Sequence, residues 1–589
     1  MESVLHLHGG TFTIQPNMSV APISYAARSL RLRLPKVCVA VTGADAAEML
    51  DKAETLVREN PFLEFRLDYL KAPLSAISYI KRLFEYRPDM IAIATCRRAA
   101  NGGKFRGSAA AQVEVLEKAA AAGCQMVDLE LESAEALKHR ELEKLRTGAT
   151  LLLSYHDFKA TRKLDETFDR MKVFQADFYK VVSTATSLHD NVTMMKFLQR
   201  TSDHHWMTGL CMGEQGIISR VLGVRAGSIF TFASAGPGEE TGPGQITARE
   251  LRETYRIDQV DAVTKVYGVA GNPVSQSKSP VMMNTAFRRE NVHGVYLPLH
   301  AKTLDDLLSC IRDIPLHGVS VTMPYKREIV KHLDNSDALT AQSGSCNTVV
   351  RGQDGRLFGF NTDVAGLQIP LEKYISLQGA KILLLGAGGL AGAAAFGLKA
   401  KGADIYLQNR TPQHAQSLAK KAQVKTVKRS DLSKLTFDVI LNATSVGMGS
   451  KTQSPLEENE LNAKIVFDAV YNPLETKLLK MARAKGLTVI PGIEMFVGQG
   501  ARQFEIWTGK PAPVEDMYNA VLRQLGDAVP LTPSSAELTV AAEPATVALA
   551  TEAPKPRTET AKPGTKPAKK NTPAKKAAQP AKKKIGKKK

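Results

Sequence analysis

The chain has 589 residues, of which 43% are hydrophobic and 23% charged, so most of it can bury apolar cores and a wholly disordered protein is excluded. The net charge of +19 is uneven, because residues 551–589 carry 14 basic and 2 acidic side chains, a net +12 that leaves +7 for the rest. Six widely spaced cysteines without a Cys-x-x-Cys pair exclude a disulfide scaffold and a thiolate zinc site, and they fit a reducing compartment.

The first segment, residues 1–36, contains arginine, serine and alanine but almost no acidic residues, which is weakly typical of a transit peptide. A His-Gly-Gly run and prolines interrupt any continuous amphipathic helix, so a disordered leader is the favoured interpretation. The uncharged apolar run at residues 382–398 is shorter than a bilayer span and contains glycines. The sequence therefore predicts a cytoplasmic protein without a membrane partner.

Eight short β-type runs follow between residues 37 and 234, and helical patterns separate them. Strand and helix alternating eight times predict an α/β fold with a parallel (β/α)8 barrel over residues 37–255. A doubly wound open sheet is the alternative, but eight similar units favour closure. The runs are 37–43, 62–69, 90–97, 125–131, 149–155, 177–183, 205–211 and 227–233.

Charged residues occur inside several of these predicted strands. Glu64, Arg66 and Asp68 are two residues apart and therefore face one side, while Lys180 lies mid-strand and His156 follows LLLSY at a strand end. Because both faces of a parallel barrel strand are covered, such charges are costly unless they serve a site. The pattern predicts an active site at the carboxyl ends of the strands, with internal salt bridges as the alternative. Arg97, Asp128, Glu130 and Glu132 belong to the same pattern.

The residue types also indicate a chemistry. A lysine amine among apolar neighbours can form a Schiff base with a carbonyl substrate, and a histidine can move protons near neutral pH. This pair suits an aldolase as well as a dehydratase.

The runs EFRLD, TCRRAANGG, VDLEL, SYHDF, GIISR and TGPGQ, with Lys180 between them, resemble type I 3-dehydroquinate dehydratase over about residues 37–250. The resemblance implies an imine between Lys180 and the substrate ketone, proton transfer by His156, and Glu130 as the residue that orients His156. The Gly-rich segment 234–245 is predicted to be a lid over the substrate. The resemblance implies substrate binding by Glu64, Arg66, Arg97, Arg220, Thr241 and Gln245.

Polar residues end the apolar runs of the second half, which begins at Tyr267. SQSKSP places hydroxyls after YGVAG, GVSVTMPYK ends at Lys326, and two further runs bring Asn347 and Asp363 to loop positions. Each residue alone is typical of a turn or a solvated surface. These residues become candidate site residues only if the fold brings them close to the segment that follows.

That segment, KILLLGAGGLAGAAAFGL, predicts a buried strand, a glycine turn and a helix. Gly386, Gly388 and Gly389 would let the backbone approach a pyrophosphate at the helix N-terminus, although the spacing departs from strict GxGxxG. The next predicted strand ends in Asn409-Arg410-Thr411, where an NAD site would place an acidic residue. Arginine accepts a 2′-phosphate instead, so the sequence favours NADP over NAD.

GNPVSQSKSP, GVSVTMPYK, SGSCNTV, GFNTD, GAGGLAGA, NATSVGM, DAVYNPLET and GIEMFVGQGARQF closely resemble shikimate dehydrogenase over about residues 265–526. The resemblance implies that Lys326, paired with Asp363, is the acid/base group for the carbonyl that is reduced. In the same pattern Gln276 replaces a common histidine, and Gly392 stands where a basic residue often follows the glycine turn. The implied substrate-binding residues are Ser277, Ser279, Thr322, Asn347, Tyr471 and Gln499, and the implied cofactor-binding residues are Gly386, Ala387, Gly388, Gly389, Leu390, Ala391, Asn409, Arg410, Thr411, Ala443, Thr444, Ser445, Gly447, Val470 and Gly492.

The second half therefore predicts two domains and a tail. A substrate-binding domain covers residues 264–365 plus about 495–526, and a Rossmann-like NADP-binding domain covers 366–494. Residues 527–589 form a Pro/Ala/Lys-rich basic tail that is predicted to be disordered and either binds anionic polymers non-specifically or acts as a solubilising extension. No aromatic residue is interleaved with its lysines, so base stacking is not available.

The two resemblances support one function, because dehydration of 3-dehydroquinate yields 3-dehydroshikimate, which the second half would reduce to shikimate. The prediction is a bifunctional enzyme, a lyase and an oxidoreductase, with NADP(H) as cofactor and no metal. One alternative is an NAD-dependent quinate/shikimate-type oxidoreductase with a degenerate barrel. Another is a nucleic-acid-associated protein that carries the basic tail.

Overall fold

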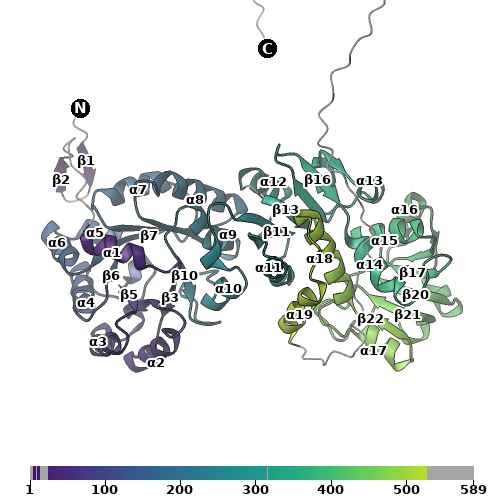
Figure 1. The fold of residues 1–589 in the computed structure, drawn as a ribbon, viewed down its shortest axis with the longest axis horizontal. Helices are drawn as coiled ribbons and strands as arrows, with labels where there is room; N and C mark the ends of the chain where they lie inside the picture. Colours follow the sequence, from purple (N-terminus) through teal and green to yellow (C-terminus); the bar gives the residue numbers. More distant parts are fainter. Residues whose placement is uncertain (1–3, 8–9, 14–23, 315, 527–589) are drawn as a thin grey trace, which may run out of the picture. The chain divides into compact units, whose positions relative to one another are not determined.

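The structure is a computed structural model that describes residues 4–7, 10–13, 24–314 and 316–526 (Figure 1). These residues all belong to one compact unit, Met1–Thr532. The predicted basic tail at 527–589 lies outside the described residues. No helix in the described ranges is long and apolar enough to cross a membrane.

The first half is a barrel of eight parallel strands in the order β10-β3-β4-β5-β6-β7-β8-β9. A backbone hydrogen bond of 2.9 Å from Ile229 N, just before β10, to Met207 O of β9 links the two edges of the sheet, so the barrel is nearly closed. Each of the eight predicted runs overlaps one strand, which confirms the predicted barrel. Most strand residues are buried because helices cover the outer face. The strands are β3 Val37–Val41, β4 Phe62–Arg66, β5 Ile91–Thr95, β6 Met126–Glu130, β7 Thr150–His156, β8 Phe178–Thr184, β9 Met207–Met212 and β10 Thr231–Ser234.

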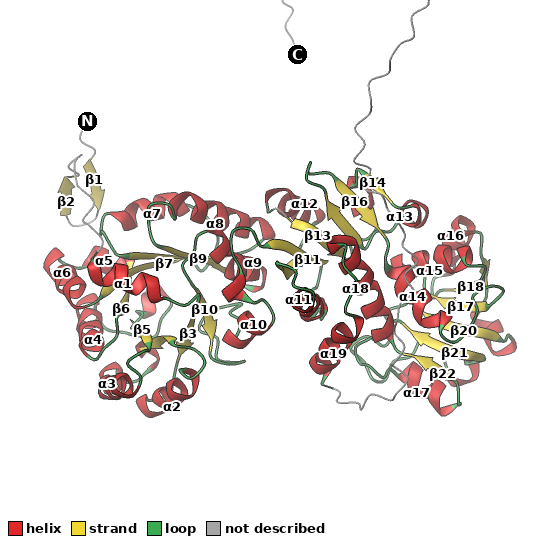
Figure 2. Cartoon of the chain, viewed as in Figure 1, coloured by secondary structure: helices red, strands yellow, loops and turns green. Residues whose placement is uncertain are grey.

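Amphipathic helices surround this barrel (Figure 2). The helix α3, for example, buries Ile80 and Leu83 against the strands, and Asp45 and Ser108 cap the first turns of α2 and α4 by accepting hydrogen bonds from backbone amides. The helices are α2 Ala46–Leu56, η1 Leu67–Tyr69, η2 Pro73–Ala76, α3 Ile77–Tyr86, η3 Ala99–Asn101, α4 Ala109–Ala121, α5 Leu131–Ala136, α6 His139–Gly148, α7 Leu164–Lys172, α8 Leu188–Thr201, η4 Glu214–Gly216, α9 Ile217–Leu222, η5 Val224–Ala226, α10 Ala248–Glu253 and η6 Ile257–Gln259.

Part of the predicted leader is ordered. Strands β1 (Val4–Leu7) and β2 (Gly10–Thr13) pair antiparallel, and α1 (Tyr25–Arg33) is a helix capped by Ser24. Ala27 and Leu30 of α1 are buried in the same cluster as Phe62 and Phe178, the first residues of β4 and β8. Helix α1 therefore packs on the amino-terminal end of the barrel, and the predicted disordered leader of 36 residues is too long.

The second half begins with a six-stranded sheet in the order β12-β11-β13-β15-β16-β14, in which β15 runs antiparallel to both neighbours. Its strands are β11 Lys265–Gly271, β12 Gly294–His300, β13 Leu316–Val321, β14 Asn335–Ser336, β15 Thr348–Arg351 and β16 Leu357–Phe360. Its helices are α11 Ser279–Arg289, α12 Leu304–Asp313, η7 Ile329–His332 and α13 Ala338–Ser343.

A second six-stranded sheet, entirely parallel, has the order β19-β18-β17-β20-β21-β22. The strand order reverses beside β17, and in such sheets ligands bind at the carboxyl ends of the strands next to that point. Its strands are β17 Lys381–Leu385, β18 Asp404–Gln408, β19 Lys425–Thr426, β20 Phe437–Asn442, β21 Ala463–Asp468 and β22 Thr488–Ile490. The helices around it are α14 Asp363–Glu372, α15 Gly389–Ala400, α16 Pro412–Ala422, η8 Arg429–Lys434, η9 Glu458–Glu460 and α17 Lys477–Ala484.

The last two helices return to the first of these sheets. In α18 (Gly492–Thr508) and α19 (Val514–Leu525), the buried side chains of Phe504 and Met517 join a cluster with Tyr267 of β11 and Phe287 of α11. Burial of these large side chains explains why residues far apart in the chain complete one domain.

Candidate active sites

One cavity lies at the carboxyl ends of the barrel strands. The structure places eight of the nine site residues predicted in the first half in its lining, whereas Glu130 is outside it. The convergence arises because alternate residues of neighbouring strands point into the lumen. The eight residues are Glu64, Arg66, Arg97, His156, Lys180, Arg220, Thr241 and Gln245.

Lys180 projects from β8 into this cavity and its side chain is only 5% exposed. Its Nζ lies 3.1 Å from Asp128 Oδ2, 3.6 Å from Glu64 Oε1 and 3.7 Å from the centroid of the Phe232 ring. The prediction of an apolar environment for the Lys180 amine is therefore wrong in part, because two carboxylates face it. These carboxylates offset the cost of burying a cation and hold the amine in one position.

Asp128 is the residue of this site whose importance the sequence analysis missed. Its carboxylate accepts hydrogen bonds from Ser154 Oγ (2.6 Å), Arg97 Nη2 (2.9 Å) and Lys180 Nζ (3.1 Å). Burial alone would raise the pKa of Asp128, but Lys180 and Arg97 outweigh it and lower the pKa to about 2. Asp128 is thus an anion that joins the lysine and the arginine. The pattern of charges on β6 was the available signal.

His156 ends β7 and faces the same cluster. Arg97 Nη1 lies 3.0 Å from its Nδ1 and 2.5 Å from its Nε2. Because a guanidinium only donates hydrogen bonds, the ring nitrogen that it approaches accepts one and is unprotonated. Burial, and then the charges of Arg97 and Lys180, lower the pKa of His156 well below its ordinary value. The imidazole is therefore neutral and available as a base.

Glu130 forms no hydrogen bond or ion pair with His156 among the described residues, and the orienting role implied by the family resemblance stays a prediction. The chain turns from β6 into α5 directly after Glu130, and the carboxylate faces α4 and the segment after β5. There it accepts hydrogen bonds from Arg98 N (2.9 Å) and from Gln112 Nε2 of α4. Glu130 therefore supports the segment that carries Arg97. For the same reason Glu132 belongs to α5 and not to the strand.

Arg220 lines the same cavity together with Thr241 and Gln245 of the predicted lid. The guanidinium is buried, and burial lowers the pKa of Arg220 to about 10. Its one hydrogen-bond partner among the described residues is Pro243 O, at 3.0 Å from Nη2, and its Nε has none. In the same segment Thr241 N and Oγ1 donate to Gln245 Oε1. A buried cation without a carboxylate partner fits a site for an anionic group of the substrate.

Glu64 and Arg66 lie on the same side of β4 and are held by neighbours. Glu64 Oε1 accepts a 2.7 Å hydrogen bond from Thr95 Oγ1, and Arg66 forms two hydrogen bonds to Asp68 of 2.9 and 3.0 Å. Their fixed polar atoms suit recognition of substrate hydroxyls.

The second half contains its own polar cluster, centred on Asp363 at the start of α14. Lys326 Nζ lies 2.6 Å from Asp363 Oδ2, and Asn347 Nδ2 donates to Asp363 Oδ1 at 2.8 Å and to Gln499 Oε1 at 3.4 Å. The structure thus brings together four residues that the sequence predicted for substrate binding and proton transfer. Asp363 is buried, whereas the Lys326 side chain is 19% exposed, so the amine faces the open side.

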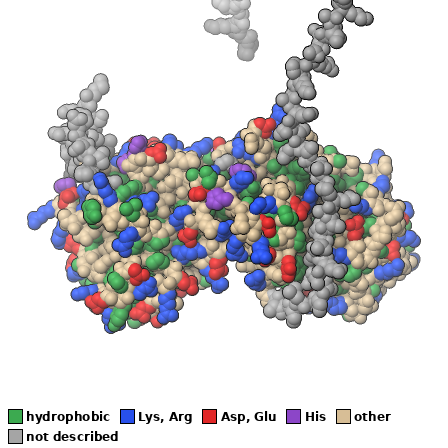
Figure 3. Space-filling view, viewed as in Figure 1, with side chains coloured by type: hydrophobic (Ala, Val, Ile, Leu, Met, Phe, Trp, Pro, Cys, Tyr) green, Lys and Arg blue, Asp and Glu red, His purple; other side chains and the backbone are tan. Residues whose placement is uncertain are grey.

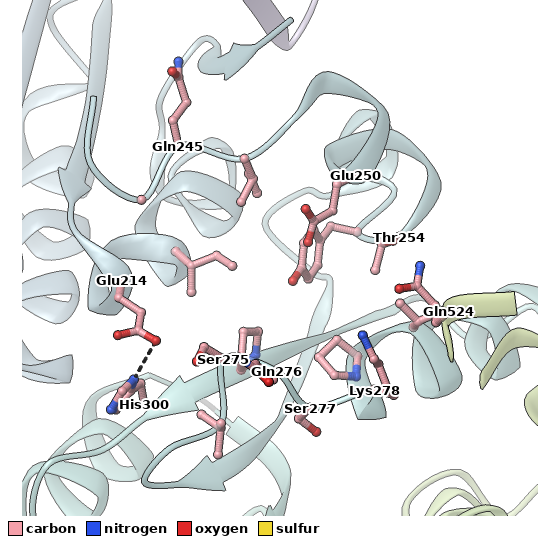
Figure 4. Close-up of a pocket in the computed structure, with 18 residues that line it drawn as sticks. Glu214, Gln245, Glu250, Thr254, Ser275, Gln276, Ser277, Lys278, His300 and Gln524 are labelled. Carbon is pink, nitrogen blue, oxygen red and sulfur yellow. Dashed lines mark ion pairs between the residues drawn. The ribbon is translucent and has the colours of Figure 1, made fainter. Parts of the chain in front are cut away.

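Residues 275–278 line a cavity of about 330 Å³ that Glu214, Gln245 and Glu250 of the first half also line, whereas Lys326, Asn347, Asp363 and Gln499 are not in its lining (Figure 4). Ser277 is in its lining, and its Oγ accepts a hydrogen bond from Ser279 N, whereas Ser279 itself is buried. Gln276, which replaces the common histidine, lines the same cavity. The ring of Tyr471 stacks on Phe496 with centroids 4.3 Å apart, and burial raises the pKa of Tyr471.

Thr322 follows β13 directly, and its backbone N donates to Ala270 O at 2.9 Å. Its methyl group would lie 2.4 Å from a Cβ placed on Gly271, so a larger residue at 271 would displace it. The hydrogen bond from Thr322 N to Ala270 O fixes the start of the loop that leads to Lys326.

The predicted cofactor residues all follow the carboxyl ends of β17, β18, β20, β21 and β22. Gly386 has φ +113°, a conformation that favours glycine, and a Cβ on Gly388 would meet no atom within 4 Å. The turn therefore leaves open space at the N-terminus of α15, where backbone amides can bind phosphate. These observations fit a dinucleotide.

Arg410 lies just after β18 and is exposed. It forms no hydrogen bond or ion pair with any residue that the structure describes, and Asn409 Nδ2 fixes the adjacent turn by donating to Thr411 O at 2.9 Å. A free guanidinium at this position is suited to a 2′-phosphate.

Four families match successive parts of the chain. They are type I 3-dehydroquinase over residues 37–262, the shikimate dehydrogenase substrate binding domain over 269–349, shikimate / quinate 5-dehydrogenase over 369–469, and the shikimate 5′-dehydrogenase C-terminal domain over 492–522. The matches follow the order of the barrel and the two sheets.

Known relatives cover the same regions. The bifunctional 3-dehydroquinate dehydratase/shikimate dehydrogenase, chloroplastic, of Arabidopsis thaliana is 32% identical over 497 residues, which are 80% of this chain and 79% of the relative. The shikimate dehydrogenase (NADP(+)) of Pyrococcus furiosus is 39% identical over 273 residues, 45% of this chain and 98% of the relative. The solved dehydroquinate dehydratase and shikimate dehydrogenase of S. pombe AroM is 23% identical, with a TM-score of 0.39 and coverage of 84% of this chain and 99% of that one.

The matches agree with the two predicted activities and with the predicted cofactor. The chain belongs to the family of bifunctional 3-dehydroquinate dehydratase/shikimate dehydrogenases.

Proposed function

We propose that the barrel dehydrates 3-dehydroquinate to 3-dehydroshikimate and that the second half reduces this product to shikimate with NADPH. The observation that carries the proposal is the placement of Lys180, neutral His156 and unpaired Arg220 around one cavity. The direct test is to incubate purified protein with 3-dehydroquinate and NADPH and to follow shikimate formation. A clear preference for NADH in a parallel titration would instead support the NAD-dependent alternative.

In the dehydration, the Lys180 amine attacks the ketone carbon of the substrate, and loss of water gives an imine. His156 removes the proton next to the imine carbon and then protonates the departing hydroxyl, so that one water leaves. Hydrolysis of the imine frees the enone product and the amine. Asp128 is the counter-ion of the nitrogen throughout, and Arg220 binds the substrate carboxylate.

In the reduction, NADPH supplies a hydride to the substrate carbonyl when it is bound. Lys326 donates a proton to the carbonyl oxygen, and Asp363 orients the amine through the 2.6 Å contact. Asn347 and Gln499 hold Asp363 and present polar atoms to the ring hydroxyls. Ser277, which lines the cavity of about 330 Å³, would bind the carboxylate.

Asp128→Asn is expected to slow dehydration by about 10- to 100-fold, the effect of losing a hydrogen bond to a charged group. The amide cannot balance the charge of the nitrogen on Lys180, although the size of the side chain is kept. Steady-state kinetics should show the loss in kcat more than in KM, and borohydride trapping at Lys180 should become slower. Dehydratase kinetics equal to those of the unchanged chain would exclude a charge-balancing role, and retained reductase activity is the control for folding.

Arg97→Met is expected to move the acid limb of the dehydratase pH–rate profile to higher pH. Arg97 contributes to holding the pKa of His156 well below 6.5, so its removal raises that pKa and the base becomes protonated at higher pH. In the unchanged chain, unfolding below pH 6.5 takes up a proton that folded His156 does not bind, so the free energy of unfolding falls as the pH decreases.

The matched control is Arg98→Met, which removes the same charge from a side chain that contacts Ser133 and not His156. An acid limb that stays in place in Arg97→Met, or that moves equally in both variants, would contradict the role of Arg97.

For location and partners, we propose a reducing compartment, with the cytoplasm as the predicted one, because all six cysteines are free and buried. The Arabidopsis relative is named as chloroplastic, so the transit-peptide interpretation stays open. Basic and acidic side chains are interspersed on the face of the folded part shown in Figure 3, which gives no support for a nucleic-acid surface there. Non-specific binding of anionic polymers by the basic tail remains a prediction.

A further inference from the structure

Arg327 connects the two domains of the second half. It directly follows Lys326 in the loop after β13, which belongs to the first sheet, and its side chain is exposed. Its Nη2 donates a 3.1 Å hydrogen bond to the carbonyl oxygen of Ala387, which lies in the glycine turn of the second sheet. A guanidinium from one domain thus lies against the turn that is suited to phosphate in the other.

The glycine turn has no cation of its own. Helix α15 begins Gly389-Leu390-Ala391-Gly392, and its first basic residue, Lys399, is in the last turn. A pyrophosphate at this helix would therefore meet backbone amides and the helix dipole but no positive side chain from its own domain. There is open space beside Gly388, because a Cβ placed on this residue would meet no atom within 4 Å.

A second observation indicates a ligand at the same place. Ser345 is 1% exposed, and its Oγ has no hydrogen-bond partner among the described residues. This hydroxyl lies 3.0 Å from the position that a Cβ on Gly389 would occupy, and Lys326 Cδ lies 3.7 Å from that position. Ser345 and Lys326 of the first domain therefore border the first residue of α15. The Ser345 hydroxyl has no hydrogen-bond partner among the described residues.

We propose that Arg327 is a cofactor-binding residue that contacts the pyrophosphate of NADP(H) from the side opposite the helix amides. Arginine carries five N–H donors, and the Ala387 carbonyl uses one of them in this structure. The remaining donors suit phosphate oxygens, and the contact would join the two domains when the cofactor binds. The proposal rests on the cofactor site proposed above and adds a residue from the other domain to it.

The test compares R327Q with R410Q by isothermal titration of the full chain with NADP⁺, NAD⁺ and adenosine 2′-monophosphate. R327Q should weaken NADP⁺ and NAD⁺ by about tenfold, the effect of one exposed charge-assisted contact, and should leave adenosine 2′-monophosphate unchanged, because that probe has no pyrophosphate. R410Q should show the complementary pattern, weaker NADP⁺ and adenosine 2′-monophosphate with unchanged NAD⁺. R356Q, which removes the same charge from an exposed residue paired with Asp354, is the control and should bind all three probes as the unchanged chain does.

Unchanged NADP⁺ binding in R327Q, with weaker binding in R410Q, would overturn the role of Arg327 and leave the cofactor site in place. Equal weakening of adenosine 2′-monophosphate by R327Q would overturn the assignment to the pyrophosphate. If neither R327Q nor R410Q alters binding of any probe, the cofactor site itself is wrongly placed. Dehydratase activity of each variant, which depends on the barrel, reports that the chain is folded.

Discussion

Lys180→Ala is expected to abolish dehydration of 3-dehydroquinate and to leave reduction of 3-dehydroshikimate intact. The proposed reaction proceeds through a covalent imine, and Lys180 is the only lysine among the described residues that line the cavity shared by His156 and Arg220. Loss of the nucleophile should lower kcat by about 10⁴-fold or more, the scale on which covalent catalytic groups act. The two reactions are measured separately, as enone formation without cofactor and as NADPH oxidation with 3-dehydroshikimate.

Borohydride trapping identifies the amine directly. In the unchanged chain, reduction of the imine should add to the peptide that contains Lys180 the mass of the bound ketone less one oxygen atom, because water leaves as the imine forms and borohydride adds two hydrogens. Lys180→Ala should show no such adduct. Lys180→Met keeps an apolar side chain of similar length against the Phe232 ring and controls for the loss of packing. An adduct on another lysine in Lys180→Ala would show that the nucleophile is wrongly assigned.

Lys326→Ala is expected to lower kcat for reduction of 3-dehydroshikimate by about 10²- to 10⁴-fold, the usual contribution of general acid–base catalysis. The substrate oxygen then lacks its proton donor, while dehydration in the barrel should proceed at the unchanged rate. The measurement is NADPH oxidation under saturating cofactor, so that a change in cofactor binding does not contribute.

Two further variants separate the chemistry from the general effect of charge. Asp363→Asn removes the carboxylate that lies 2.6 Å from the Lys326 amine and should also slow the reduction. Lys331→Ala removes an exposed lysine five residues farther along the chain and should have no effect. Equal rates in Lys326→Ala and in the unchanged chain would remove Lys326 from the mechanism.

Local sequence patterns determined most of the fold of this protein. Each of the eight barrel strands overlaps a predicted run and ends no more than one residue beyond it, because short apolar runs between helical patterns are a local signal of buried parallel strands. The period of two in a strand also predicted that Glu64, Arg66 and Lys180 would face a common interior, and strand ends predicted where His156 would lie. The positions of the glycine turn and of Arg410 could likewise be predicted from the sequence, since both come shortly after predicted strands.

The tertiary structure decided which of these charged groups are partners. Asp128, which had no predicted role, joins Lys180 to Arg97, whereas Glu130, two residues later, points to Arg98 and Gln112 because the chain turns into α5. Two other interactions also depend on surfaces that meet only in the folded chain. They are the packing of α1 on the barrel and the hydrogen bond from Arg327 to Ala387 O. A residue's position along a strand follows from a local period, but its hydrogen-bond partners lie on other elements, and their distance and direction are set by how those elements pack.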